Sequence, residues 1–260
     1  YTPGAPFWGS GTRWVGFKHF KNFVQGEYFV RFLTNTLRLN LMSLVLGFWV
    51  PIVFALVVNE VRNGFFKKFV QTVSYLPHFI SSVVVAGMVL SFTSTRGLIS
   101  QVVMHLGGQS AAINTDPNAF PWVFTLTSIW MSYGWSSILY LSTISSIDPA
   151  LYEAAEMDGA GRWKKMGYIT LPSMLPLISI QLIFFVGGML GSDTQFILLL
   201  QNPAVLKTAD VIGTYVYREG LQGGQFSSAG ASGLFMSVIG FALVYGSNYL
   251  SRKMSDYSLW

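Results

Sequence analysis

Five stretches of the sequence are strongly apolar, are as long as a membrane-crossing helix and hold almost no charged residues. They cover residues 35–58, 70–92, 120–145, 171–192 and 231–251. A helix needs about 20 mostly apolar residues to cross the hydrocarbon core of a bilayer. Each stretch therefore predicts one membrane-spanning helix. Together they predict an all-α, polytopic transmembrane helix bundle over residues 35–251.

The composition agrees with lipid as the natural surroundings of most of the chain. Hydrophobic residues make up 52% and charged residues 10% of the 260 residues, whereas an ordinary soluble domain is about 25% charged. Pro51, Pro77 and Pro176 lie inside or near the ends of the apolar stretches. Membrane helices tolerate proline where neighbouring helices satisfy the freed backbone groups. A bundle is therefore expected rather than a lone anchor.

Several classes of site have no support in the composition. The chain has no cysteine, and its histidines (His19, His78 and His105) are scattered, so no metal site is predicted. No grouping of His, Asp, Glu, Ser or Lys suggests catalytic residues. The net charge of +5 comes from Lys and Arg in segments between apolar stretches. Membrane proteins carry orienting charge in such segments, so no nucleic-acid partner is predicted.

Basic residues in the connections predict the orientation of the chain. One alternate set of connections holds Arg62, Lys67, Lys68, Arg162, Lys164, Lys165, Arg252 and Lys253. The other set holds Arg13, Lys18, Lys21, Arg31, Arg96, Lys207 and Arg218. The first set is packed into less than half as many residues as the second. Because cytoplasmic loops carry an excess of Lys and Arg, the first set is assigned to the cytoplasm.

The same assignment places residues 1–34 on the external side, together with two long connections, 93–119 and 193–230. These connections are rich in Gly, Pro, Asn and Gln, and either contact a partner or serve as simple connectors. The chain begins with Tyr1 rather than Met, and residues 1–11 have the composition of a loop. We expect that the N-terminus is missing and that a further hydrophobic segment is missing with it.

The connection after the third stretch, SIDPALYEAAEMDGAGRWKKMGYITLP over residues 146–172, predicts a short capped helix. Asp148 is a good N-cap because its carboxylate can accept from the free N–H groups of the first turn. Pro149 suits the first helical position. Gly159 and Gly161 offer a left-handed stop. A second, amphipathic segment follows, in which Trp163, Met166 and Ile169 recur three residues apart as in helices that lie at a membrane face.

The capped helix has the residues of a docking surface. Ala154 and Ala155 allow a partner's backbone to approach, and Glu153, Glu156 and Asp158 offer charge pairing to Arg or Lys. A solvated loop with a helical turn is the alternative that the residues alone leave open.

A longer pattern in this connection resembles that of a known family. Glu153-Ala154-Ala155, then Gly159 after three residues, then Ile169-Thr170-Leu171-Pro172 after nine more, resembles the EAA motif of binding-protein-dependent ABC importer permeases. Every fixed position of the motif is matched. Further stretches resemble the polysaccharide permease subfamily of that family. They are residues 69–81, 202–205, 209–212, 214–218 and 250–253.

The resemblance implies a type I ABC importer permease fold and a single transmembrane domain over residues 1–260. Of its six core helices, one would precede this chain. Residues 146–170 would form the cytoplasmic coupling loop, which docks on a separate ATPase. The docking residues would be Glu153, Ala154, Ala155, Glu156, Asp158 and Gly159.

The resemblance also implies partners. These are a second permease subunit, two cytoplasmic ATPase subunits and an external solute-binding protein that delivers an oligosaccharide, in a bacterial inner or plasma membrane. The chain has no Gly-x-x-x-x-Gly-Lys-Ser/Thr phosphate loop. We therefore expect it to be no enzyme and to bind no cofactor, with ATP and Mg held by the partner ATPase.

The cargo path is expected along the inward faces of the spans. Trp130, Tyr133 and Trp135 lie in the third stretch, and aromatic faces stack well on sugar rings, although they also serve as packing and interface anchors. Asp193 follows the fourth stretch as a candidate charge at the pathway. Gln195 could supply neutral hydrogen bonds to sugar hydroxyls, with ordinary loop polarity as the alternative.

Arg38 lies near the outer start of the first stretch. A charge within the membrane usually faces a cavity or a partner, but an arginine here could equally reach the outer headgroups. If Arg38 faces the pathway, a cationic lining would suit an acidic oligosaccharide such as a uronate.

Three alternative functions are weighed against sugar import. An ABC permease for amino acids, peptides or phosphate would keep the EAA motif, but the subfamily likeness argues against it. A transporter driven by an ion gradient would need acidic or His residues in the middle of its spans, and the span centres hold almost none. A membrane enzyme would need a catalytic cluster, and no such cluster is evident.

Overall fold

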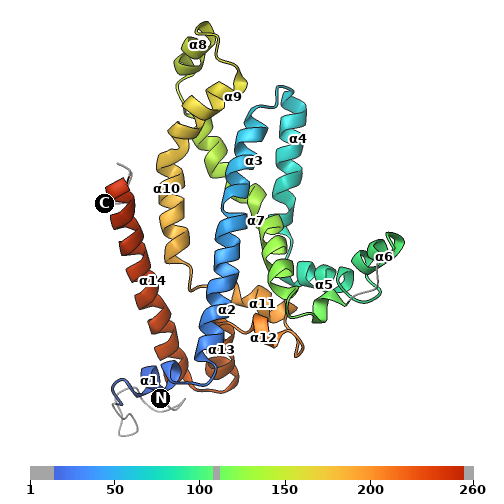
Figure 1. Ribbon diagram of the computed structural model, residues 1–260, viewed down its shortest axis with the longest axis vertical. Helices are drawn as coiled ribbons and strands as arrows, with labels where there is room; N and C mark the ends of the chain where they lie inside the picture. The colour runs from blue at the N-terminus through green and yellow to red at the C-terminus, as the bar shows by residue number, and fades with distance from the viewer. Residues whose placement is uncertain (1–14, 108–111, 255–260) are drawn as a thin grey trace. The chain divides into compact units, whose positions relative to one another are not determined.

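The computed structural model describes residues 15–107 and 112–254, and every regular element within them is a helix (Figure 1). The all-α prediction is therefore confirmed. The loop predicted over residues 1–11 and the external charge Arg13 lie outside the described residues. The first half of the chain contains α1 (Lys18–Val24), α2 (Phe29–Met42), the π-turn η1 (Ser43–Gly47), α3 (Trp49–Asn59), α4 (Gly64–Tyr75), the 3₁₀ turn η2 (Leu76–Phe79), α5 (Ser82–Phe92), α6 (Leu98–His105) and η3 (Ile113–Thr115). The second half contains α7 (Phe120–Ser145), α8 (Pro149–Met157), α9 (Arg162–Lys165), the π-turn η4 (Met166–Thr170), α10 (Leu171–Gly187), α11 (Thr194–Leu200), α12 (Leu206–Ala209), α13 (Ile212–Tyr217), the π-turn η5 (Arg218–Gln222) and α14 (Phe226–Met254).

The chain forms two compact units, each assembled from three separate stretches. Unit 1 comprises Tyr1–Leu41, Ser82–Phe124 and Gly187–Leu243. Unit 2 comprises Met42–Ser81, Thr125–Val186 and Val244–Trp260. The expectation of one transmembrane domain over residues 1–260, with an external segment 1–34, stays a prediction.

Unit 1 is held together by an aromatic core and by side-chain bonds from α2. Phe23, Phe32 and Ile212 are buried together, and the ring of Phe32 lies 5.1 Å from that of Tyr215. The side-chain amide of Asn35 donates to the carbonyl oxygens of Lys207 (3.0 Å) and Asp210 (2.9 Å). These bonds fix the stretch around α12 and α13 to α2, since they satisfy backbone groups that a loop would otherwise leave unpaired.

Unit 2 is built around the helices α3, α7 and α10, which contribute one buried cluster together with Phe48, the residue before α3. Its members are Phe48, Ile52, Ala55, Val58, Tyr140, Leu141, Ile144, Met174 and Ile178. Helix α4 approaches α7 closely at Gly134, where a Cβ atom would overlap the backbone carbonyl of Ser74. Only glycine leaves room for this approach.

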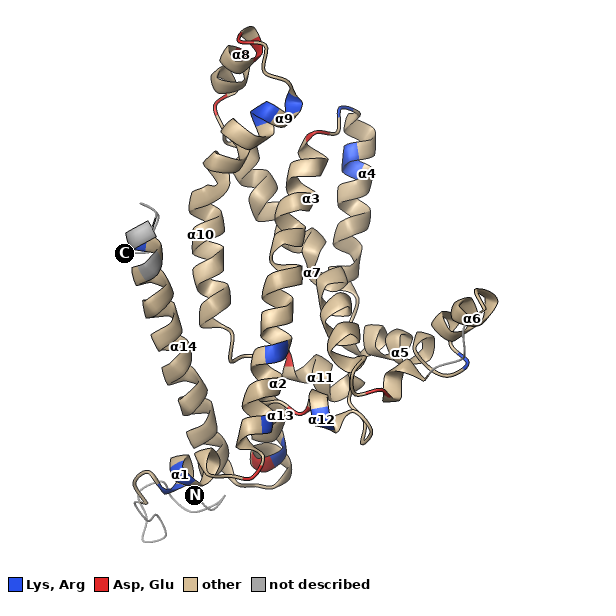
Figure 2. Cartoon of the chain, viewed as in Figure 1, with Lys and Arg blue, Asp and Glu red and all other residues tan. Residues whose placement is uncertain are grey.

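Three helical runs among the described residues are long and apolar enough to cross a membrane. They are Phe29–Asn59, Arg162–Gly187 and Phe226–Tyr249. Helix α7 coincides with the predicted span 120–145, but hydroxyl residues dilute its apolar sequence and it is not one of the three. The long helices carry almost no charge, and most Lys, Arg, Asp and Glu lie near helix ends and in connections (Figure 2).

The second predicted span, residues 70–92, is not one continuous helix. Helix α4 runs into η2, the chain is extended at Ile80 (φ −79°, ψ 133°), and α5 starts at Ser82. Pro77 lies in the 3₁₀ turn, where its ring and its missing N–H disfavour a continuing α-helix. The stretch counts as a fourth span only if this bent pair crosses as one unit. The expected five spans therefore require both the pair and α7 to cross.

The helical runs do not begin and end where the predicted spans do. The run that holds the first predicted span begins at Phe29 rather than at residue 35. The run that holds the fourth extends from Arg162 to Gly187 rather than over 171–192, and the run that holds the fifth extends from Phe226 to Tyr249 rather than over 231–251. The basic segment expected to lie at the membrane face is helical and continues through the π-turn η4 into α10, and its place relative to the membrane stays a prediction.

Candidate functional site

The predicted capped helix after α7 is present as α8. The Asp148 carboxylate accepts from the Ala150 N–H at 2.9 Å, and Pro149 occupies the first helical position. Gly159 ends the helix with a left-handed φ of 76°. Gly161 does not share that role, because it is extended (φ −71°, ψ 169°) and precedes α9 as its N-cap.

The residues of the EAA motif lie on an exposed surface. Helix α8 contains no buried residue. Ala155 is half-buried, and the other predicted docking residues are exposed, namely Glu153, Ala154, Glu156, Asp158 and Gly159. Met157 beside them is 89% exposed. The carboxylates and small residues of α8 are therefore open to contact by a partner.

Polar contacts hold α8 to the helix that follows it. The Tyr152 hydroxyl lies 2.9 Å from Oγ1 of Thr170 in η4. Lys165 Nζ lies 3.1 Å from a Glu156 carboxylate oxygen. Glu156, expected to offer its charge to a partner, therefore already has an intramolecular partner.

The start of α9 is also tied to the end of α3. Arg162 Nε donates to the Glu60 carboxylate at 2.9 Å, and its Nη2 donates to the Glu60 carbonyl oxygen. The two side chains are 50% and 28% exposed.

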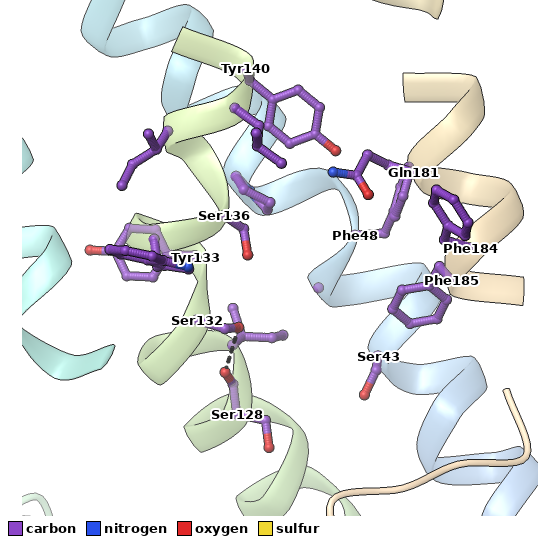
Figure 3. Close-up of a pocket in the computed structure, with 16 residues that line it drawn as sticks. Ser43, Phe48, Ser128, Ser132, Tyr133, Ser136, Tyr140, Gln181, Phe184 and Phe185 are labelled. Carbon is purple, nitrogen blue, oxygen red and sulfur yellow. Dashed lines mark hydrogen bonds between the residues drawn. The ribbon is translucent and has the colours of Figure 1, made fainter. Parts of the chain in front are cut away.

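A cavity of about 670 Å³ lies in unit 2 (Figure 3). Residues of η1, α3, α7 and α10 and their junctions line it: Ser43, Gly47, Phe48, Pro51, Ser128, Ile129, Ser132, Tyr133, Trp135, Ser136, Ile138, Leu139, Tyr140, Gln181, Phe184 and Phe185. None of these lining residues is charged. A volume of this size, with mostly apolar walls and a few polar groups, is typical of a small-molecule site.

Hydroxyl groups form a row on the α7 wall of the cavity. Ser128, Ser132 and Ser136 are spaced four residues apart, which places them on one helical face. Ser132 Oγ donates to the Ser128 carbonyl at 2.8 Å. Ser128 Oγ is buried and has no hydrogen-bond partner in the structure. The Gln181 amide and the Tyr140 hydroxyl point toward one another at one end of the cavity (Figure 3).

Two of the three predicted aromatic residues line this cavity. Tyr133 packs edge-on against Phe54, with ring centroids 5.2 Å apart. Trp135 stacks on His78 at 4.7 Å with an interplanar angle of 4°. Trp130 is 42% exposed and is not one of the lining residues.

The polar predicted residues, Arg38, Asp193 and Gln195, belong to unit 1 and do not line the cavity. All three are exposed. Asp193 is the N-cap of α11, where its carboxylate accepts from the Phe196 N–H at 3.0 Å. This local bond gives Asp193 a structural role that the sequence did not identify.

The sequence analysis did not identify the serine row, Ser43 or Gln181 as cavity-lining residues. The four-residue spacing of the serines along an otherwise apolar helix could have indicated the row, because it marks one polar face.

A buried ionic cluster in unit 1 was missed as well. Asp210 is 2% exposed. Its carboxylate lies 3.0 Å from Arg31 and 3.3 Å from Arg218, and it accepts from Thr214 Oγ1 at 2.7 Å. The two arginines had been counted only as external charges, because nothing local in the sequence pairs Arg31 with a residue so distant along the chain.

The comparison with known families decides the class of this chain. Residues 31–256 match the family described as the binding-protein-dependent transport system inner membrane component. The chain belongs to this family. The permease is thus a transport component of an inner membrane.

Two curated relatives cover nearly all of the permease. Protein LplB of Bacillus subtilis is 38% identical over 261 residues, which is 100% of this chain and 81% of that protein. The polygalacturonan/rhamnogalacturonan transport system permease protein YteP of the same organism is 41% identical over 259 residues, which is 98% of this chain and 80% of that protein.

Two solved structures share the fold. A chain of a bacterial ABC transporter involved in the import of the acidic polysaccharide alginate aligns with a TM-score of 0.90 and 42% identity, covering 94% of the permease and 86% of that chain. The bacterial alginate ABC transporter in complex with its alginate pentasaccharide-bound periplasmic protein gives a TM-score of 0.90 and 41% identity, over 94% and 85%. The predicted type I ABC importer permease fold is confirmed by this likeness.

Proposed function

We propose that the permease is a membrane-spanning subunit of an ATP-driven importer of acidic oligosaccharides. The observation that carries the importer part of this proposal is the combination, in one unit, of an exposed, capped EAA helix and a neutral cavity lined with hydroxyl and aromatic groups. The gradient-driven alternative is set aside by family membership.

Helix α8 is the proposed contact to the ATPase. Glu153 and Asp158 offer carboxylates, and Ala154, Ala155 and Gly159 allow close backbone approach; Glu156 contributes while paired with Lys165. We propose two ATPase subunits, a second permease subunit and an external binding protein as partners. ATP and Mg would be held by the ATPases, and the permease itself would bind no cofactor.

The cavity in unit 2 is the proposed part of the cargo path. Sugars present apolar ring faces and many hydroxyl groups, which suit aromatic side chains and neutral hydrogen-bonding groups respectively. Tyr133, Trp135 and the serine row on α7 supply both kinds of contact. Trp130, Asp193 and Gln195 remain proposed pathway residues outside the cavity lining.

The acidic character of the cargo is supported by the relatives, whose names specify polygalacturonan and alginate. The cavity carries no charge, so a uronate carboxylate would need a cation elsewhere on the path. Arg38 is the proposed cation. It is exposed and lies in the helical run that continues into Ser43 and Gly47.

The test is uptake by the complete importer in liposomes with its binding protein, using labelled oligogalacturonate, alginate oligosaccharide and a neutral maltooligosaccharide. ATP-dependent uptake of one of the acidic sugars is expected, with the neutral sugar excluded. Arg38→Ala should lower acidic uptake several-fold, while Arg96→Ala, at an external arginine, should leave it unchanged. Uptake without ATP dependence would refute the ATP-driven importer, and preference for the neutral sugar would refute the acidic cargo.

A further inference from the structure

The connection between α8 and the cavity wall passes through one continuous helical run. Arg162 begins α9, which continues through the π-turn η4 into α10 and ends at Gly187. Gln181, Phe184 and Phe185 at the far part of this run line the cavity. Thr170 precedes Gln181 by about 16 Å along the helix axis, at about 1.5 Å per residue.

Helix α8 itself has little apolar packing to set its position. It buries no residue, and Leu151 and Met157 are 51% and 89% exposed. Its position relative to the following helix therefore depends on side-chain contacts. Two are present, the Tyr152–Thr170 hydrogen bond at 2.9 Å and the Glu156–Lys165 ion pair at 3.1 Å.

The two contacts differ in strength. The Glu156 side chain is 75% exposed and the Lys165 side chain 20% exposed, so solvent screens this ion pair from the Glu156 side and reduces its contribution. Thr170 is 2% exposed, so its hydroxyl is shielded from water. If Tyr152 moves away, that hydroxyl keeps only the longer hydrogen bond, at 3.5 Å, to the Lys165 carbonyl, and the loss is costly because no water replaces the tyrosine. Tyr152 is therefore the firmer attachment of α8.

The attachment point lies in a π-turn. Thr170 is the last residue of η4, and π-turns are wide, locally less regular segments that occur frequently at functional sites. A displacement of Tyr152 that is passed to Thr170 therefore acts directly before α10, where the helical run departs from regular α-helical geometry.

From this geometry we infer that Tyr152 is a positioning residue whose hydrogen bond to Thr170 transmits displacement of α8 to α10 and to the cavity wall. The inference rests on the proposed function, because it requires ATP-driven movement of α8. When the bond is absent, ATPase closure moves α8 without moving α10 to the same extent. ATP is then hydrolysed with less cargo carried per ATP.

The test measures uptake of labelled oligogalacturonate and ATP hydrolysis together in the reconstituted complete importer. Tyr152→Phe and Thr170→Val each remove the hydrogen bond and should lower cargo per ATP about three- to tenfold, the range expected for one lost hydrogen bond, with the hydrolysis rate undiminished. The double variant should be no worse than either single variant, because both remove the same contact. Thr170→Ser keeps the hydroxyl and should retain coupling.

The matched control is Tyr168→Phe, which removes a hydroxyl from the same π-turn at a side chain that is 83% exposed. It should leave cargo per ATP unchanged. Unchanged coupling in Tyr152→Phe, additive losses in the double variant, or a Thr170→Ser defect as large as that of Thr170→Val would overturn the inference. If the Thr170→Val importer does not assemble, the cargo carried per ATP by the Tyr152→Phe importer alone decides whether the hydrogen bond couples α8 to α10.

Failure of this inference is distinguishable from failure of the proposed function. If the unaltered importer shows no ATP-dependent uptake, the proposed function fails. If it transports and Glu153→Arg abolishes uptake while Tyr152→Phe has no effect, only the role of the hydrogen bond is refuted.

Discussion

Helix α8 and the cavity wall on α7 follow one another in the chain, yet they present their functional groups in opposite ways. Helix α8 exposes its carboxylates and small residues and is held by a few polar side-chain contacts. Helix α7 turns its serines and aromatic residues toward a cavity and is fixed by close packing at Gly134. The comparison suggests that α8 is suited to being moved by a partner and α7 to keeping a fixed lining.

The largest expected effect separates these two roles at α8. Glu153→Arg reverses a charge at the proposed ATPase contact and should reduce uptake more than about tenfold, because like charges then meet across the interface. Binding of cargo to the cavity should be unchanged. Uptake and cargo binding by the assembled importer are the two measurements.

Glu27→Arg is the matched control for this prediction, since it makes the same charge change at an exposed residue of unit 1. If Glu153→Arg weakened cargo binding as strongly as uptake, the division of roles between α8 and the cavity would not hold.

A smaller effect is expected at the cavity. Gln181→Leu replaces a neutral hydrogen-bonding side chain of the cavity wall by an apolar one of similar size. It should raise the half-saturating cargo concentration about three- to tenfold. The ratio of cargo to ATP at saturation should not change. Titration of uptake against cargo concentration measures both.

Gln225→Leu, at an exposed position outside the cavity lining, controls for loss of an amide. An unchanged half-saturating concentration in Gln181→Leu would remove the α10 wall from the proposed cargo path.

The smallest effect is expected at the ion pair between the end of α3 and the start of α9. Glu60→Gln weakens the partly exposed ion pair with Arg162 and should lower the free energy of unfolding by less than about 1 kcal/mol. Thermal unfolding in detergent is the measurement, with Glu27→Gln for comparison. A large fall in Tm would mean that this ion pair, and not the Tyr152 contact, chiefly holds the loop.

The sequence predicted α8 well because its determinants are local. The N-cap Asp148, Pro149 and the left-handed Gly159 act within one helix, and the structure contains each of them as expected. The ends of the spans were less predictable. Hydropathy indicates which residues tolerate lipid, but it does not reveal that a basic segment continues as helix into α10.

The cavity and the ionic cluster were not predictable for a different reason. The serines of α7 become a lining only when η1 and α10 face them, and Asp210 gains Arg31 only through tertiary folding. The cavity and the cluster therefore depend on packing between segments that are distant in the chain. The break after Pro77 was hard to predict for another reason: Pro51 lies within the helical run Phe29–Asn59 without interrupting it, so the presence of a proline alone does not tell where a span breaks.

The Asp210 cluster has a consequence for the biogenesis of the permease. Its carboxylate joins Arg31, made early in synthesis, to Arg218, made late. Until the chain has been synthesised past Asp210, Arg31 cannot form this ion pair, so the link between α2 and the stretch before α13 is completed late. In ribosome-bound chains that end before Asp210, Arg31 would therefore depend on water for its hydrogen bonds, and the ionic cluster would assemble only in the last part of synthesis.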